Sequence, residues 1–119
     1  MIIENETTGE ILAQRVRVCD TFLSRGRGLM FRRPLREDEA YLFIGRRESV
    51  SDSAIHTFFV FSPIAVVWLD ADRRVIDARL ARSFRPYFAP ARPAQYFLEG
   101  HPSLRGKVQV GDRIRWEPA

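Results

Sequence analysis

The sequence predicts a mainly β or α+β fold: a compact, antiparallel-rich, β-barrel-like domain of about seven short strands with one short helix. The first observation behind this prediction is a series of apolar runs rich in strand-forming residues, separated by Gly, Pro and Asp turn signals. The second is that helical periodicity is confined to one segment, residues 21–31. The third is size, because 119 residues, 45% of them hydrophobic, suit one core-forming domain, residues 1–119.

The N-terminal third is expected to hold two strands and the helix. Residues 2–4 form a short first strand. From Ile11 to Cys19, Val16 and Val18 alternate with arginines, which is the pattern of a half-buried strand. A polar residue at position 20 or 21 then supplies the helix N-cap.

An arginine-glycine box occupies residues 25–32, inside the expected helix. On a helical wheel, Gly26 falls within the apolar stripe, where it permits close packing against a sheet. Gly28 falls on the polar side, where a helical glycine costs about 1 kcal/mol without any packing gain. We therefore expect Gly28 to end the helix as a left-handed C-cap or to let a ligand approach the backbone. Arg25 and Arg27 could clamp a phosphate or carboxylate there, and a plain surface role explains them equally well.

The rest of the chain is expected to be strands and turns. In order, the expected elements are a charged turn at 36–39, a strand at 40–44, a polar loop at 45–52, buried strands at 55–61 and 64–69, a turn at 70–73, a strand at 75–80, an irregular segment at 83–93, a strand at 94–98, a helical turn or loop at 101–104 and a terminal turn and strand at 108–116. Three prolines exclude regular structure from the irregular segment.

Charge argues against a nucleic-acid partner. Nineteen basic residues against fifteen acidic ones give a formal net charge of +4, but Lys107 is the only lysine. Such arginine-rich usage is what a GC-rich genome produces without selection for function. The arginines are dispersed among the acidic residues, whereas electrostatic binding needs charge gathered on one face.

No membrane span and no secretory signal are expected. Residues 53–69 are free of charged side chains apart from His56, but Ser62-Pro63 interrupts the run and strand formers dominate it. The N-terminus lacks the basic start and long apolar region of a signal peptide. The single cysteine, Cys19, excludes an intramolecular disulfide. We therefore expect a cytoplasmic protein.

His56 is the best single functional candidate, because its ring can donate, accept or bind a metal at the edge of a Phe-rich strand. A hydrogen-bonded structural role is the competing interpretation. No other His or Cys is placed to complete a metal site, so neither a metal nor a cofactor is expected. Cys19 could form a nucleophilic pair with His56 or His101 as its base, but a small buried thiol explains it better.

Glu99 follows an apolar strand, which makes it the exception among the carboxylates. If its side chain points inward, it needs a partner such as Arg25 or Arg27. That ion pair would be structural or would form the wall of an anion site.

Several short motifs follow one another along the chain. They are Asp20-Thr21, residues 25–32 with Pro34-Leu35, Leu42-Phe43, His56 to Phe59, Pro63-Ile64, Val67 to Asp70, Val75-Ile76, Tyr96 to Gly100 and Val110 to Asp112. This ordered set, over about residues 16–116, resembles the bacterial and archaeal family known as domain of unknown function 192, or uncharacterised protein family 0127. The resemblance implies a compact β-rich domain with one short helix and brings no reaction, cofactor or catalytic residue. The chain departs from the family at 60–61 and at Ala65, where Asp is common.

These observations predict a non-catalytic domain that binds a small ligand or a protein partner through Arg25, Arg27, Gly28, His56 and Glu99. Two alternatives stay open. One is a small hydrolase or transferase that uses His56. The other is weak nucleic-acid binding through the dispersed arginines.

Overall fold

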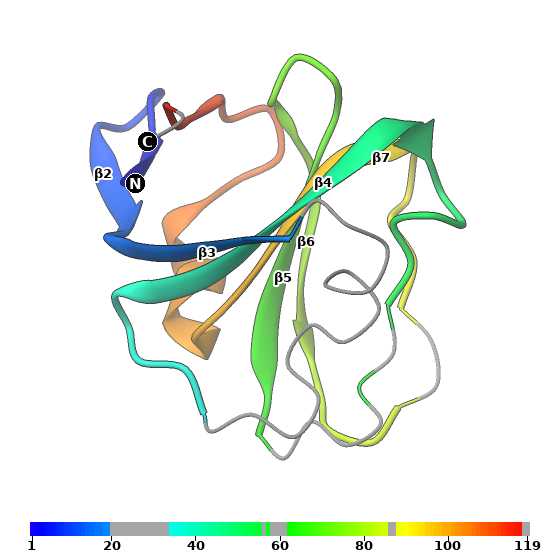
Figure 1. Ribbon diagram of the computed structural model, residues 1–119, viewed down its shortest axis with the longest axis horizontal. Helices are drawn as coiled ribbons and strands as arrows, with labels where there is room; N and C mark the ends of the chain where they lie inside the picture. The colour runs from blue at the N-terminus through cyan, green and yellow to red at the C-terminus, as the bar shows by residue number, and fades with distance from the viewer. Residues whose placement is uncertain (20–33, 56, 58–61, 86–87, 118–119) are drawn as a thin grey trace.

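Two β-sheets make up the fold of the computed structural model, which describes residues 1–19, 34–55, 57, 62–85 and 88–117 (Figure 1). Their strands are β1 (Ile3–Asn5), β2 (Glu10–Ala13), β3 (Arg15–Cys19), β4 (Glu39–Ser49), β5 (Ile64–Leu69), β6 (Val75–Ala81), β7 (Ala94–Gly100) and β8 (Ile114–Arg115), with a short 3₁₀ helix, η1 (Pro102–Lys107). The predicted antiparallel-rich β domain is confirmed, although the sheets do not close into a barrel. The helix expected near 21–31 lies outside the described residues.

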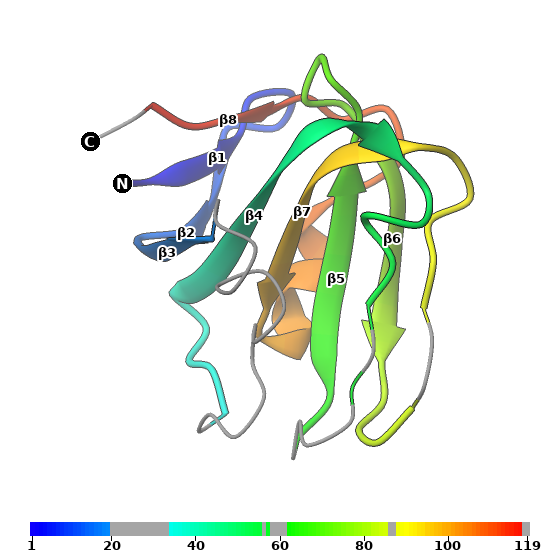
Figure 2. The same cartoon turned by 45° about the vertical axis from the view of Figure 1, so that its right-hand side comes forward.

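The larger sheet has five strands in the order β3-β4-β7-β5-β6, and the smaller one has the order β2-β1-β8. Every pairing is antiparallel except that of β3 with β4, which is parallel. The late strand β7 therefore lies between β4 and β5. Figure 2 shows the small sheet beside one end of the large sheet, with both chain termini nearby.

The two faces of the five-stranded sheet carry separate cores. On the first face, Leu42, Val67 and Leu98 pack in one cluster with residues of the small sheet and with Leu104 of η1. On the second face, the cluster includes aromatic side chains of β4, β5 and β7, namely Phe43, Trp68 and Phe97. All six residues of β5 are buried, which explains why its sequence is continuously apolar rather than alternating.

Strand β4 is longer than the sequence predicts. Residues 45–49 were expected in a polar loop, yet they continue the strand after a register shift against β7 between Ile44 and Ser49. Gly45 allows the close approach at this irregularity, because a Cβ there would lie 2.7 Å from the carbonyl oxygen of Gln95. Glycine and polar residues resemble loop signals, and the prediction was wrong because a bulged strand uses the same residues.

Two other predicted strands also differ. The strand expected from Ile11 to Cys19 is divided at Gln14, where two consecutive backbone N–H groups donate to the carbonyl of Asp38 and bend the chain. The strand expected at 55–61 begins with an isolated bridge from Ile55 to Phe88, and residues 58–61 lie outside the described part.

Candidate functional site

Glu99 lies near the end of the central strand β7, on the second face of the five-stranded sheet. Its direct cross-strand partners are Tyr41 of β4 and Val66 of β5. Arg17 pairs in turn with Tyr41, and Arg79 with Val66, at the two edges of the sheet. Because direct partners in neighbouring strands point to the same side, these five side chains form one row across this face.

The carboxyl group of Glu99 is buried without a polar partner in the described part of the chain. The residue is 5% exposed, and none of the hydrogen bonds or ion pairs among the described residues involves its side chain. Burial raises the pKa of Glu99 to about 8, because leaving water penalises the charged form. The carboxyl group is therefore mostly neutral at pH 7. A buried polar group without a partner requires an explanation, and a binding role supplies one.

An aromatic wall stands next to this carboxyl group. The rings of Phe43 and Phe97 stack with centroids 4.4 Å apart, and the ring of Tyr41 stacks on Phe43 at 6.3 Å. Trp68 follows as the cross-strand partner of Phe97, and its indole N–H donates to the carbonyl of Ser53 at 2.8 Å. These rings keep the surroundings of Glu99 apolar, and among them only Tyr41 is half-buried while the other three are buried.

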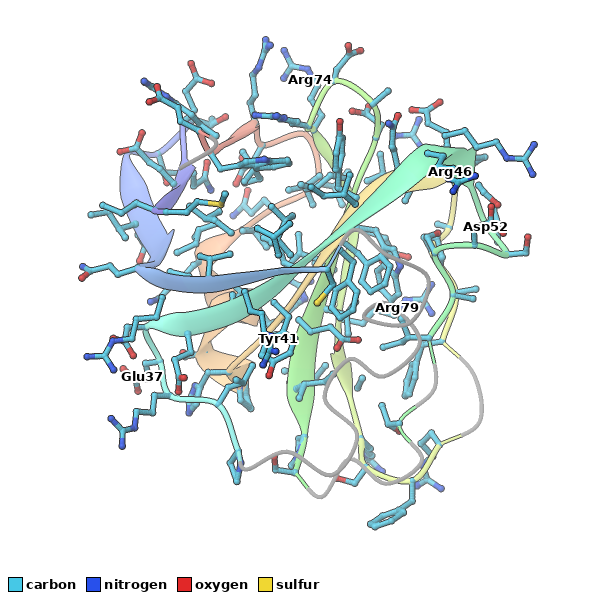
Figure 3. The ribbon with its side chains drawn as sticks, in the orientation of Figure 1. Glu37, Tyr41, Arg46, Asp52, Arg74 and Arg79 are labelled. Carbon is cyan, nitrogen blue, oxygen red and sulfur yellow. The ribbon has the colours of Figure 1, made fainter. Side chains whose placement is uncertain are left out.

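Tyr41 also reaches a cavity at the edge of the sheet. The cavity has a volume of about 580 Å³, and Leu35, Val16 and Arg17 are among the residues that line it with Tyr41. That volume lies within the usual range for small-molecule sites. Figure 3 labels Tyr41, which lies on β4 next to β3, the edge strand of the sheet. Tyr41 is thus adjacent to both the cavity and Glu99.

Four of the five residues predicted for the site, Arg25, Arg27, Gly28 and His56, lie outside the described residues. Their proximity to Glu99 stays a prediction, as does an ion pair of Glu99 with either arginine.

Cys19 ends β3 as a buried residue in the cluster on the second face, in agreement with the expected small buried thiol. Within the ranges that the structure covers, no group of three or more His, Cys, Asp or Glu could hold a metal ion.

Tyr41 is the site residue that sequence reasoning missed. The sequence places Tyr41 in an apolar strand, and its period-two relation to Phe43 is the available signal. That relation places both rings on one face, but the sequence does not say which strand pairs with β4. Only the insertion of β7 brings Glu99 opposite Tyr41.

The known proteins similar to this chain include members of one uncharacterised family and solved structures of the same fold. The sequence profile of the family DUF192, described as "Uncharacterized ACR", matches residues 3–116. UPF0127 protein TK1120 of Thermococcus kodakarensis is 40% identical over 119 residues, which cover 98% of this chain and 74% of that protein. UPF0127 protein PYRAB11210 of Pyrococcus abyssi is 35% identical over 117 residues, or 97% of each chain.

Two solved structures show the same fold. A protein of unknown function from Novosphingobium aromaticivorans superposes with a TM-score of 0.80 at 20% identity, covering 97% of this chain and 82% of that one. A candidate transcription regulator of Sinorhizobium meliloti 1021 gives a TM-score of 0.79 at 18% identity, covering 96% and 89%. At such identities the likeness concerns the fold alone.

Proposed function

We propose that this chain, which belongs to the DUF192 family of uncharacterised proteins, binds a small molecule on the second face of the five-stranded sheet. Glu99 and the aromatic wall would form the binding site. The observation that carries this proposal is the buried carboxyl group of Glu99, which has no polar partner among the described residues. We propose a non-catalytic role.

The neutral carboxyl group defines the chemistry of the ligand. A protonated carboxyl donates one hydrogen bond through its O–H and accepts others through its carbonyl oxygen. A ligand that offers an acceptor such as a carbonyl oxygen would satisfy the donor, and its flat apolar part would pack on the half-buried ring of Tyr41. Such a ligand enters most directly through the cavity beside Tyr41. The proposed ligand is therefore a small, largely apolar molecule with one hydrogen-bonding end.

The sequence-derived candidates extend this proposal. His56 and the segment from Arg25 to Gly28 are proposed to complete the site, and His56→Ala tests the catalytic alternative separately.

The nucleic-acid alternative gains no support from the likeness to a candidate transcription regulator, because 18% identity does not transfer a role. A cytoplasmic location also stays a proposal. The described residues include no helix long and apolar enough to cross a membrane.

Ligand-observed NMR with a fragment library tests the proposal at pH 6.5 and at pH 9.5. Fragments should bind the wild-type protein at pH 6.5 and lose about tenfold in affinity at pH 9.5, where the carboxyl group has ionised. Glu99→Gln retains a donor and an acceptor, so its binding should not depend on pH. Glu99→Met, which removes both, should not bind the same fragments.

Glu37→Gln is the matched control, because Glu37 is exposed on the turn before β4 and is labelled in Figure 3. It should bind like the wild type at both pH values. Thermal melts confirm that each variant is folded. Fragments that bind Glu99→Met as tightly as the wild type, or a library without any binder, would contradict the proposal.

A further inference from the structure

A guanidinium group stands at the outer end of the row that contains Glu99. Arg17 is exposed on the edge strand β3 and pairs in register with Tyr41. Cys19, two residues further along β3, packs in the cluster on the second face, so Arg17 points to that face as well. None of the hydrogen bonds or ion pairs among the described residues involves the Arg17 side chain. Its charge can therefore meet a ligand.

The carboxylates at the start of β4 have other partners. Asp38 pairs with Arg15 at 3.4 Å. The carboxylate of Glu39, which lies opposite Arg15 in the parallel register, accepts from the backbone N–H of Arg36 at 2.9 Å. Arg15 thus has a counter-ion, whereas Arg17 on the same strand has none in the part of the chain that the structure describes.

Arg17 and Tyr41 both line the cavity of about 580 Å³ at the edge of the sheet. Val16 and Leu35 add apolar side chains to its wall, and Glu39 is the one carboxylate among the described residues there. A guanidinium group beside apolar side chains suits a ligand that has one anionic group and an apolar body.

The spacing of the strands sets the size of this ligand. Arg17 and Glu99 lie on opposite sides of Tyr41, which is labelled in Figure 3. Because neighbouring strands are about 4.8 Å apart, the backbones of Arg17 and Glu99 are about 10 Å apart. A molecule with one aromatic ring and a polar group at each end can span the two side chains and cover the half-buried ring of Tyr41.

We propose that the ligand of the Glu99 site is a planar organic carboxylate, whose anionic end is bound by Arg17 at the edge of the sheet. The guanidinium group of Arg17 donates two parallel hydrogen bonds to the carboxylate. The opposite end of the ligand accepts from the carboxyl group of Glu99. This inference rests on the proposed function, which concerns the end of the ligand at Glu99, and it adds the chemistry of the outer end.

A carboxylate suits this cavity better than a phosphate does. A phosphate group carries nearly two negative charges at pH 7 and calls for several positive groups. The described residues that line the cavity supply two guanidinium groups, and that of Arg15 already pairs with Asp38. The remaining group, that of Arg17, matches the single charge and the planar shape of a carboxylate.

A matched pair of probes tests the inference by ligand-observed NMR at pH 6.5. The acid para-acetylbenzoate and its amide para-acetylbenzamide share the ring and the ketone oxygen, and they differ in charge. Wild-type protein should bind the acid about tenfold more tightly than the amide. Arg17→Gln should lower the affinity for the acid to that for the amide and leave the amide unaffected. Arg17→Lys should keep part of the preference, because it retains the charge without the planar fork.

Arg46→Gln is the matched control, since it removes the same charge from an exposed residue near the other end of β4 (Figure 3). It should bind both probes like the wild type, and thermal melts confirm that each variant is folded. A third probe, para-acetylphenyl phosphate, should bind no more tightly than the acid. Tighter binding of the phosphate would overturn the assignment of a carboxylate.

The outcomes separate this inference from the proposed function. Equal affinity for acid and amide in the wild type, with binding lost in Glu99→Met, would overturn the inference and leave the proposed function standing. A preference for the acid that survives Arg17→Gln would also overturn it, and Arg17 would then only shield the edge strand from pairing. Absence of binding by both probes would overturn it as well, and the fragment library would then decide on the proposed function by itself.

Discussion

Asn5 and Glu99 are both buried polar residues, but their surroundings differ completely. The side-chain amide of Asn5 donates to the carbonyl of Lys107 at 3.1 Å and to a carboxylate oxygen of Asp112 at 2.8 Å. Its oxygen accepts from the two backbone N–H groups of residues 7–8. Asn5 is thus fully satisfied, whereas Glu99 has no polar partner among the described residues.

This difference separates a structural polar group from a functional candidate. Asn5 joins β1, its turn and the approach to β8, so its hydrogen bonds organise the small sheet. Glu99 joins nothing described, and its burial is unfavourable to its charged form. A protein retains such a group at a stability cost where function uses it. Four predictions test this contrast, in order of decreasing effect.

The largest effect should be a pH-dependent stability due to Glu99. Below pH 4.5 the carboxyl group is protonated in both the folded and unfolded states, so Glu99 does not lower the free energy of unfolding there. Between pH 4.5 and about pH 8, unfolding releases the proton, so the free energy of unfolding should fall by up to ~1.4 kcal/mol per pH unit. Above pH 8 the carboxyl group is ionised in both states, so the free energy of unfolding no longer changes with pH because of Glu99. Urea denaturation at pH 5, 6.5 and 8 measures it, and Glu99→Gln should remove this slope and be the more stable protein at pH 8.

Asn5→Ala should have the next largest effect. At pH 8 it should destabilise the protein, whereas Glu99→Gln should stabilise it. It removes both donors and the acceptor of Asn5 and leaves their part-buried hydrogen-bond partners unsatisfied, so we expect a loss of about 2–4 kcal/mol. Urea denaturation at constant pH gives the value. The contrast with Glu99 fails if Asn5→Ala leaves the unfolding midpoint unchanged.

Thr57→Val tests whether the contrast between Asn5 and Glu99 is due to their hydrogen-bond partners or to the face of the sheet on which each residue lies. Thr57 belongs to the segment that covers the second face, since Ile55 packs there, yet its hydroxyl has partners in Arg82 and Arg85. Loss of the hydroxyl should therefore destabilise the fold by about 2 kcal/mol, as for Asn5 and unlike Glu99→Gln. Thr57→Ser retains the hydroxyl and should lower the stability by less than Thr57→Val does. Thermal melts of both variants measure the difference.

Asp112→Asn should have the smallest effect, about 1 kcal/mol. One carboxylate oxygen of Asp112 accepts from both Asn5 and the N–H of Gln109. An amide oxygen in the same place can accept both bonds, and only the strengthening by charge is lost. Differential scanning calorimetry detects this change, and a loss as large as that of Asn5→Ala would show that the charge, rather than the hydrogen-bond geometry, holds the small sheet.

The amino-acid sequence by itself determined several local elements of this protein. The β5–β6 hairpin was predicted because Asp70 sits between two strand-forming runs, and its carboxylate does accept from the N–H groups of residues 72 and 74. The buried β5, the strand β7 and the helical turn after it were found for the same reason. Each depends on residues that are close together along the chain.

Only the tertiary structure decided which strands are neighbours, and with them the candidate site. The insertion of β7 between β4 and β5 places Glu99 between Tyr41 and Val66, and the length of β4 depends on its bulged pairing with β7. Burial and the shifted pKa of Glu99 follow from that arrangement. Strand order is decided by long-range packing of both sheet faces, which alternation along one strand cannot report. The sequence could therefore name Glu99 as an exception among the carboxylates, and the pairing of three distant strands made its surroundings a candidate site.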